Sequence, residues 1–320
     1  MQNFEYASPA TLQEALGLLG SQWGEADVLA GGTDLISLMK DYVQSPKRVV
    51  NIKGIKELGG IAKTSAGLRI GATVTLDELA SNALVRAEYP SLITAALGVT
   101  SPQTRNTGTV GGDLCQRPRC WYFRQGFGLL AKEVENGENR YHAIFGGPAR
   151  FVSASSFGPA LACLGAKVKL VSSKGPRELP VEQFFVSPRD GNSREIALQP
   201  NEILTEIIVP ASRGAKNATY EIRQRELMDW PLATASVVLR MKGSSVESAS
   251  ICMGHVAPTP WRASAAEKML AGKSLSPDVC EQVGAAAVQD AQPLSGNGYK
   301  VQLAKVAVKR ALMAAGGLKA

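Results

Sequence analysis

A short apolar stretch that runs directly into a pair of glycines constrains this chain more than any other local feature. The segment at residues 28–35 reads VLAGGTDL, so a predicted strand is followed by Gly31 and Gly32 and then by a predicted helix. Glycines let a phosphate approach the backbone closely, and a helix N-terminus adds free N–H groups and a positive dipole end. The segment is predicted either to bind an anion or to form a tight turn in which Thr33 or Asp34 caps the helix.

A second glycine pair favours the first alternative. The segment at residues 107–114 reads TGTVGGDL, in which Thr109 offers a hydroxyl group and Gly111 and Gly112 offer open backbone. Two such loops could hold the two halves of one dinucleotide. Neither loop has the G-x-G-x-x-G spacing of the Rossmann fingerprint or a Walker lysine, so those two binding modes are disfavoured.

The composition is that of an ordinary globular protein. Hydrophobic residues make up 45% and charged residues 20% of the 320 residues, which is enough for two or three domains. No apolar run approaches the ~18 residues that a membrane span needs, and the N-terminal segment lacks the features of a secretory signal. We expect a cytoplasmic location, or a periplasmic one if a partner subunit carries an export signal.

Charge, cysteines and histidines disfavour several other classes. The net charge of +7 is spread as single Lys and Arg residues, which argues against nucleic-acid binding. It favours a generic solvated surface over phosphate or acidic-partner binding. Five cysteines are an odd number and a poor disulfide framework, so a reducing compartment is expected. Neither His142 nor His255 lies in a zinc-binding spacing, so no metal site is predicted.

The pattern of apolar residues predicts two parts in the first two thirds of the chain. Residues 1–54 read as small βα units whose first helix is capped by Ser8. Residues 55–213 combine strands with helices, one of which is opened by a capping box of Thr75 and Glu78. The strands predicted in these parts are Asp27–Ala30, Arg48–Ile52, Leu68–Thr73, Lys167–Ser172 and Ile203–Val209.

A long loop and a linker complete the organisation. Residues 100–159 are rich in Gly, Pro, Arg and aromatic residues and show little periodicity, which is typical of a functional loop. A linker is predicted at residues 210–216, and strands followed by helices then predict an α+β domain at residues 214–320. The elements predicted there are strands at Thr219–Arg225, Ala233–Met241 and Val246–Met253, and helices at Ala263–Leu270, Pro277–Ala291 and Tyr299–Ala315.

Four segments occur in the same order in one family. AGGTDL near residue 30, TGTVGGDL near 110, NEIL at 201–204 and DWPLATASVVL at 229–239 resemble the FAD-binding subunits of xanthine dehydrogenase, carbon monoxide dehydrogenase and 4-hydroxybenzoyl-CoA reductase enzymes. CQRPRCWYFR followed by GENRYHAIFGG resembles a narrower branch that includes periplasmic aldehyde oxidoreductase. The resemblance implies an α+β protein: a two-part vanillyl-alcohol-oxidase (PCMH)-type FAD domain, divided at residue 54, and a CO dehydrogenase flavoprotein-like C-terminal domain from residue 214.

The resemblance also implies which residues bind FAD. The first glycine loop would wrap the pyrophosphate and the second would form the facing wall, while Glu202 belongs to a segment near the adenine or ribitol. Arg223 and Trp230 fall beside the isoalloxazine ring, where a cation stabilises electron density on the reduced flavin. The implied set is Leu29, Ala30, Gly31, Gly32, Thr33, Asp34, Leu35, Val99, Thr100, Thr109, Gly112, Asp113, Ser156, Ile203, Leu204, Arg223 and Trp230.

The chain departs from the family pattern in two ways. Ser156 stands where an Asp often hydrogen-bonds the cofactor, and Asp113 stands where Asn is common. Some relatives also hold a [4Fe–4S] cluster on four cysteines in the loop after the second glycine motif. Here that loop has only Cys115 and Cys120, and Cys163 is expected to be a buried thiol on an apolar helix. No cluster is predicted.

Structural or interface roles are predicted for the remaining residues of the long loop. His142 is predicted to be a structural histidine that bonds the loop to itself. An interface is favoured slightly over a core position for the aromatic residues of the loop, which are Trp121, Tyr122, Phe123 and Phe127.

The resemblance implies an electron-transfer subunit of a heteromeric molybdenum hydroxylase or dehydrogenase. FAD on this chain would take electrons from a [2Fe–2S] small subunit and pass them to an external acceptor, while a molybdenum-cofactor large subunit oxidises the substrate. No catalytic acid or base is then needed on this chain, and neither nucleic acid nor membrane is an expected partner. The alternatives are a flavin-free scaffold subunit of the same complex and a stand-alone flavin oxidase.

Overall fold

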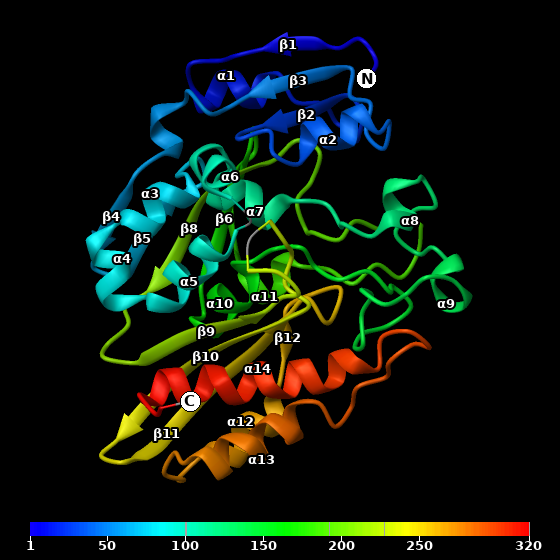
Figure 1. The fold of residues 1–320 in the computed structure, drawn as a ribbon. Coiled ribbons are helices and arrows are strands. Elements are labelled where there is room, and N and C mark those ends of the chain that lie inside the picture. Colours follow the sequence, from blue (N-terminus) through cyan, green and yellow to red (C-terminus); the bar gives the residue numbers. More distant parts are fainter. Residues whose placement is uncertain (100, 192, 227, 320) are drawn as a thin grey trace.

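A computed structural model describes residues 1–99, 101–191, 193–226 and 228–319 (Figure 1). Three sheets follow one another along the sequence and across the molecule: a three-stranded sheet, a five-stranded sheet and a four-stranded sheet. Helices pack between and beside these sheets. This arrangement confirms the predicted α+β class.

The first sheet is small and parallel, with the strand order β1-β3-β2. Its strands are β1 (Glu5–Ala7), β2 (Ala26–Leu29) and β3 (Arg48–Asn51), connected by α1 (Leu12–Gly17) and α2 (Leu35–Lys40). The first glycine loop is the connection from β2 to α2. It therefore lies at the carboxyl end of a parallel strand, where open α/β sheets bind ligands.

The predicted start of α1 is wrong. Thr11, not Ser8, caps the helix: its hydroxyl oxygen accepts from the Glu14 N–H at 3.2 Å, and the Glu14 carboxylate accepts from the N–H groups of Thr11 and Ala10. This reciprocal capping box satisfies free N–H groups that a cap at Ser8 would leave open. Pro9 lies outside the helix for the same reason.

The second sheet is antiparallel, with the order β4-β5-β8-β6-β7. Helices on one side of it bury a large apolar core that includes Leu92, Phe157 and Ile207. The predicted capping box of Thr75 and Glu78 is confirmed. The strands are β4 (Ile61–Thr64), β5 (Gly67–Gly71), β6 (Lys167–Ser172), β7 (Gly175–Pro180) and β8 (Ile203–Pro210); the helices are η1 (Lys56–Leu58), α3 (Leu76–Ser81), α4 (Ala83–Glu88), α5 (Pro90–Gly98), α10 (Gly158–Cys163) and α11 (Val181–Phe184).

The long loop contains helices that periodicity does not predict. They are α6 (Pro102–Thr107), α7 (Val110–Cys115), α8 (Trp121–Arg124) and α9 (Glu133–Asn136). Each has fewer than two turns, so an apolar face cannot repeat within it. The caps at Ser101 and Thr109, whose side chains accept from Thr104 N and Gly112 N, are the local signals that were missed.

The third sheet is antiparallel, with the order β12-β11-β10-β9, and α14 lies against it (Figure 1). The apolar face of α14, with Ala304, Val308 and Ala311, is buried in one core with the inner face of β10. The predicted order of strands followed by helices is confirmed. The elements are β9 (Lys216–Ile222), β10 (Ala233–Lys242), β11 (Ser245–Gly254), β12 (Trp261–Arg262), α12 (Ser264–Leu270), α13 (Pro277–Ala287) and α14 (Tyr299–Gly316).

Across the described residues, no helix combines the length and the apolar character that crossing a membrane requires.

Candidate functional site

The two glycine loops, eighty residues apart in sequence, touch each other. A Cβ atom on Gly31 would lie 2.8 Å from Cα of Gly108 and closer still to the carbonyl oxygen of Thr107. Lys53 Nζ reinforces the contact by donating to the same Thr107 oxygen at 3.3 Å. Only a residue without a side chain fits at position 31, because backbone atoms of the second loop occupy the place of a Cβ.

Two neighbouring pockets lie along the loops and share five wall residues, namely Thr33, Asp34, Thr109, Gly112 and Gln116. We infer that they are the two ends of one cleft. Two short helices, α2 and α7, start beside it, and Thr109 caps α7 by accepting from Gly112 N at 3.1 Å. The hydroxyl oxygen of Thr109 is therefore already used by the protein, and its side chain shapes the wall of the cleft.

One end of the cleft is lined by the first loop and by β8. Ala30, Gly31, Gly32 and Leu35 lie there, together with the remaining predicted residues of this end, Ile203 and Leu204. Leu29 does not line the cleft. Glu202 also lines it, but its carboxylate is held by Arg177 at 2.6 and 2.7 Å.

Two arginines that the sequence analysis missed line the same end. The guanidinium of Arg194 stacks on the Trp23 ring, 3.8 Å from its centroid, and Arg117 forms an ion pair with the buried Glu195. Burial, reinforced by the nearby positive charge of Arg117, lowers the pKa of Arg194 to about 10. The charges of Glu195 and Asp27 act in the opposite direction. Because Arg194 forms no salt bridge with any described residue, an anion in the cleft would stabilise its charge.

The other end of the cleft is lined by Val99, Asp113 and Trp230. Arg119 stacks over the Trp230 ring at 4.5 Å from its centroid and also reaches Asp34 Oδ1 at 3.4 Å. The resemblance implied a cation beside the flavin ring at this end and assigned it to Arg223. Thr100, which was predicted beside Val99, lies outside the described residues.

Arg223 is near this end but does not line the cleft. It forms an ion pair with Glu221, and both side chains pack against Gly98, where a Cβ would lie 2.6 Å from Arg223 Nη2. Burial raises the pKa of Glu221 to about 7, while Arg223 acts in the opposite direction.

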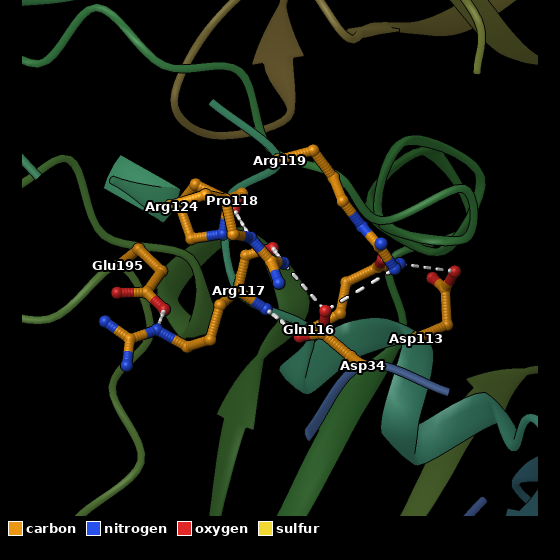
Figure 2. A network of polar contacts seen from close by, with 8 residues as sticks. All are labelled: Asp34, Asp113, Gln116, Arg117, Pro118, Arg119, Arg124 and Glu195. Carbon is orange, nitrogen blue, oxygen red and sulfur yellow. Dashed lines mark hydrogen bonds and ion pairs between the residues drawn. The ribbon is translucent and has the colours of Figure 1, made fainter. Parts of the chain in front are cut away.

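Asp34 fastens the long loop to the first glycine loop (Figure 2). It occupies the N-cap position of α2, yet its carboxylate makes no capping bond. Instead Oδ2 accepts from Arg117 N at 2.8 Å and Oδ1 accepts from Arg124 Nη2 at 2.7 Å. Both carboxylate oxygens are thus used by the long loop, so the alternative in which Asp34 caps the helix is wrong.

Asp113 organises the wall opposite. Its buried carboxylate accepts from Ser155 Oγ at 2.5 Å, from the N–H groups of Ser156 and Phe157 at 3.3 and 3.2 Å, and from Gln116 Nε2 at 2.9 Å. Burial raises the pKa of Asp113 to about 6, although these hydrogen bonds oppose the shift. Ser156 is 2% exposed and does not line the cleft, so it contributes here through its backbone.

The five cysteines are free thiols, and Cys163 and Cys252 lie together in the core. Burial raises the pKa of Cys115 to about 12, and Cys120 Sγ lies 3.1 Å from His142 Nε2. Cys163 lies buried on α10 as predicted, and its thiol donates to the Ser236 carbonyl at 3.0 Å. No cluster of three or more metal-ligating side chains occurs among the described residues. The absence of an iron–sulfur cluster stays a prediction.

The aromatic residues of the long loop pack mostly on one another. Trp121 and Tyr122 make edge and tilted contacts with His142, and Phe123 is buried beneath Arg117. Of these four aromatic residues only Phe127 is exposed, at 51%, as a residue of the predicted interface would be. His142 bonds the loop to itself through Cys120, as predicted, and its carbonyl oxygen also accepts from Lys300 of α14.

The residues present fit a dinucleotide such as FAD. The glycine-lined middle of the cleft gives close access to the backbone, where a diphosphate needs it. Two arginines lie at one end and an arginine-stacked indole at the other.

Two family models match the chain. The FAD binding domain in molybdopterin dehydrogenase matches residues 2–212, and the CO dehydrogenase flavoprotein C-terminal domain matches residues 218–315. The carbon monoxide dehydrogenase medium chain of Hydrogenophaga pseudoflava is 31% identical over 98% of this chain and 96% of its own length. The aldehyde oxidoreductase FAD-binding subunit of Escherichia coli is 32% identical over 95% and 96%.

Solved structures agree with the sequence relatives. A chain of carbon monoxide dehydrogenase from Hydrogenophaga pseudoflava superposes with a TM-score of 0.79 and 30% identity, covering 99% of this chain and 98% of that one. The match extends through both parts of the fold, and it confirms the predicted resemblance, its fold and its cofactor. This chain belongs to the family of FAD-binding subunits of the molybdenum hydroxylases, which includes carbon monoxide dehydrogenase, aldehyde oxidoreductase and xanthine dehydrogenase.

Proposed function

We propose that the cleft holds FAD with its diphosphate between the two glycine loops, and that this chain transfers electrons within a larger molybdenum enzyme. One observation carries the proposal: two loops from distant parts of the chain meet without side chains between them at the middle of a single cleft. A diphosphate is the part of FAD that needs backbone N–H groups at close range.

The residues of the cleft divide into three roles. Gly31, Gly32 and Gly112 give the diphosphate access to the backbone. Arg194, at the end that Ile203 and Leu204 line, would supply positive charge to the phosphate on the adenosine side of the diphosphate. Asp34 positions Arg119 and Arg124 and thereby closes the long loop over the site.

The flavin ring would lie at the end lined by Val99, Asp113 and Trp230. Flavin, when bound, exchanges electrons singly or in pairs, and the protein positions it and adjusts its potential. The Arg119 guanidinium, held over the Trp230 ring, would stabilise negative charge on a reduced ring. The Asp113 carboxylate accepts four hydrogen bonds from the protein, so it serves to build the wall and not to move protons.

The chain is proposed to receive electrons from a [2Fe–2S] subunit, beside a molybdenum-cofactor subunit that oxidises the organic substrate. Relatives are named medium chains or FAD-binding subunits, which implies other chains in each enzyme. The domain boundaries at residues 54 and 213 belong to the same proposal. The net charge of +7 suits an acidic electron-donor partner.

The test is to purify a tagged copy of the chain from its native cells. We expect FAD on the chain, two further subunits in fixed ratio, and molybdenum and iron in the complex. Photoreduction of the iron–sulfur partner should then bleach the visible absorbance of the flavin. A colourless chain that takes up no added FAD would support a scaffold instead. A yellow chain that purifies alone and oxidises an organic compound by itself would support a stand-alone oxidase.

A further inference from the structure

The long loop is attached to two different parts of the fold. Its beginning is fastened to Asp34 of the first glycine loop. Its later part packs with the C-terminal domain: the backbone N–H groups of Ile144 and Phe145 donate to the Val256 carbonyl at 2.8 and 3.1 Å, and the Phe145 ring stacks on Trp261 with 4.8 Å between the centroids. Ile144 and Phe145 are buried in the same apolar core as β10 and α14. This stretch of loop is therefore part of the C-terminal domain in space, although it precedes that domain in sequence.

Lys300, in the first turn of α14, lies at the centre of this attachment. It is 1% exposed, and its Nζ donates to the carbonyl oxygens of Tyr141, His142 and His255 at 3.1, 3.0 and 2.7 Å. Burial lowers the pKa of Lys300 to about 7. The three carbonyl oxygens favour its charged form, because only an ammonium group donates three hydrogen bonds. A buried charge needs such partners in place of water, so this side chain and the loop backbone hold each other.

Two residues of the segment before α14 bond the same stretch of loop. Asn297 Nδ2 donates to the carbonyl oxygens of His142 and Ala143 at 3.1 and 3.2 Å. The N–H of Gln292 donates to the Ile144 carbonyl at 2.7 Å. All these hydrogen bonds end on backbone oxygens of the loop, so they fix the path of its backbone directly.

The anchored stretch contacts the residues that follow Arg119. His142 Nε2 lies 3.1 Å from Cys120 Sγ, and the His142 ring makes an edge contact with the Trp121 ring, with 5.9 Å between the centroids. Arg119 directly precedes Cys120 in the chain and stacks over the Trp230 ring. The backbone that presents Arg119 to the flavin end is therefore supported by the stretch that Lys300 anchors.

Arg119 depends on this support because its own hydrogen bonds are weak. Its Nη2 lies 3.4 Å from Asp34 Oδ1 and 3.5 Å from Gln116 Oε1, both long for a hydrogen bond, and its Nε has no partner among the described residues. Trp230, on the other side of the stack, lies within the C-terminal domain. The stack thus requires that the loop be fixed relative to that domain.

We propose that Lys300 is a positioning residue for the flavin: it attaches the long loop to the C-terminal domain and so holds the Arg119 guanidinium over Trp230. Lys300 is not among the described residues that line the cleft, so it acts through Arg119. The consequence for the flavin rests on the proposed function, because it requires a flavin ring at this end of the cleft. The effect on the stack does not depend on a bound flavin.

The stack can be followed without flavin, by fluorine NMR of the full chain labelled with fluorotryptophan. Trp230→Phe identifies the Trp230 resonance. Arg119→Met should shift this resonance, and Lys300→Met, which keeps the length of the side chain and removes its N–H groups, should shift it in the same direction. In the double variant Lys300→Met should add no further shift, because the guanidinium is already gone. An unchanged Trp230 resonance in Lys300→Met, or additive shifts in the double variant, would overturn the proposal.

The matched control is Lys305→Met, which makes the same change further along α14, where the ammonium group pairs with Glu281 of α13. It should leave the Trp230 resonance and, in the FAD-bound chain, the flavin potential as they are. Equal changes in the two lysine variants would show that any lost charge on α14 has this effect, and would contradict the assignment.

The same variants with FAD bound test the consequence for the flavin. Lys300→Met should weaken the binding of reduced FAD about tenfold relative to oxidised FAD, which lowers the two-electron midpoint potential by about 30 mV. In the Arg119→Met background it should have no effect. A lowered potential that persists there would come from the Lys300 charge itself and would refute action through Arg119. If the unchanged chain binds no FAD, the proposed function fails, while the flavin-free NMR experiment still decides on the anchor.

Hydrogen exchange tests the attachment if Lys300→Met does not fold. Coupling between two sites is reciprocal, so FAD binding to the unchanged chain should slow exchange of the Ile144 and Phe145 amides, which donate to Val256. The Cys280 amide, which donates to Ser276 in α13, should exchange at the same rate with and without FAD. Exchange of Ile144 and Phe145 that is equal in both states would rule out the coupling.

Discussion

Replacing Gly31 by alanine tests the contact between the two loops. The added Cβ would lie 2.8 Å from Cα of Gly108, whereas carbon atoms in contact are ~3.5 Å or more apart. The carbonyl of Thr107 is closer still, and both obstacles are backbone atoms that cannot rotate away. The loops must therefore separate by roughly 1 Å.

This separation affects stability and binding differently. Overpacking of this size costs about 1–3 kcal/mol of folding free energy, which leaves a domain of ordinary stability folded. A diphosphate held between the loops loses at least one hydrogen bond to a charged group, at about 1.5–3 kcal/mol. We therefore expect the dissociation constant for FAD to rise about 10- to 100-fold.

The assay is a fluorescence titration of flavin-free protein with FAD, alongside urea unfolding. Gly17→Ala is the matched control, because a Cβ there meets nothing within 4 Å and the residue ends α1 in the same N-terminal segment. It should leave the affinity for FAD unchanged and should not lower the free energy of unfolding. If Gly31→Ala stays folded and binds FAD as tightly as the unchanged chain, the diphosphate does not lie between the loops.

Three further predictions concern charges near the cleft. Arg194→Ala should raise the FAD dissociation constant about tenfold and weaken its dependence on ionic strength; equal salt dependence would contradict a role for Arg194 at the diphosphate. Asp34→Asn removes the charge that holds Arg124, so it should lower the free energy of unfolding by about 1.5–3 kcal/mol and speed tryptic cleavage of the long loop. The control Asp41→Asn, at an exposed residue, should do neither. Burial, helped by the charge of Lys300, lowers the pKa of His255 to about 3 in the folded chain, whereas the pKa of this group in the unfolded chain is 6.5. The unfolded state therefore binds the proton first, and the free energy of unfolding falls as the pH drops below 6.5. Between pH 6.5 and pH 5 the free energy of unfolding should fall by about 1.6 kcal/mol less in His255→Gln than in the unchanged chain, because the slope is half of 1.36 kcal/mol per pH unit at pH 6.5 and approaches the full value at pH 5. Parallel curves from urea unfolding would show that His255 is not a buried neutral imidazole.

The sequence predicts the features of this fold that depend on neighbouring residues. Strand, glycine pair and helix follow one another within 28–35, and the Thr75–Glu78 capping box is complete in four residues. Short-range chemistry of this kind leaves its signal in the local pattern. The same holds for α14, whose apolar face recurs over several turns.

The contacts that complete the cleft are long-range and leave no such signal. Asp34 reads equally well as a helix cap until the structure shows Arg124, ninety residues away, bonded to it. Arg119 and Trp230 are likewise separated by more than a hundred residues. The resemblance assigned the cation beside the flavin to Arg223, but that side chain pairs with Glu221 and lies outside the cleft. Which arginine reaches the site is decided by tertiary packing.

The central claim is that both halves of a dinucleotide lie in one cleft, joined at the two glycine loops. Comparing FAD with FMN tests it most directly, because FMN lacks the diphosphate bridge and the adenosine that the Arg194 end would hold. Titration of the flavin-free chain should show FAD binding at least ~100-fold more tightly, a difference of about 3 kcal/mol. Equal affinities for FAD and FMN would mean that the loops do not grip a diphosphate, and would contradict the account.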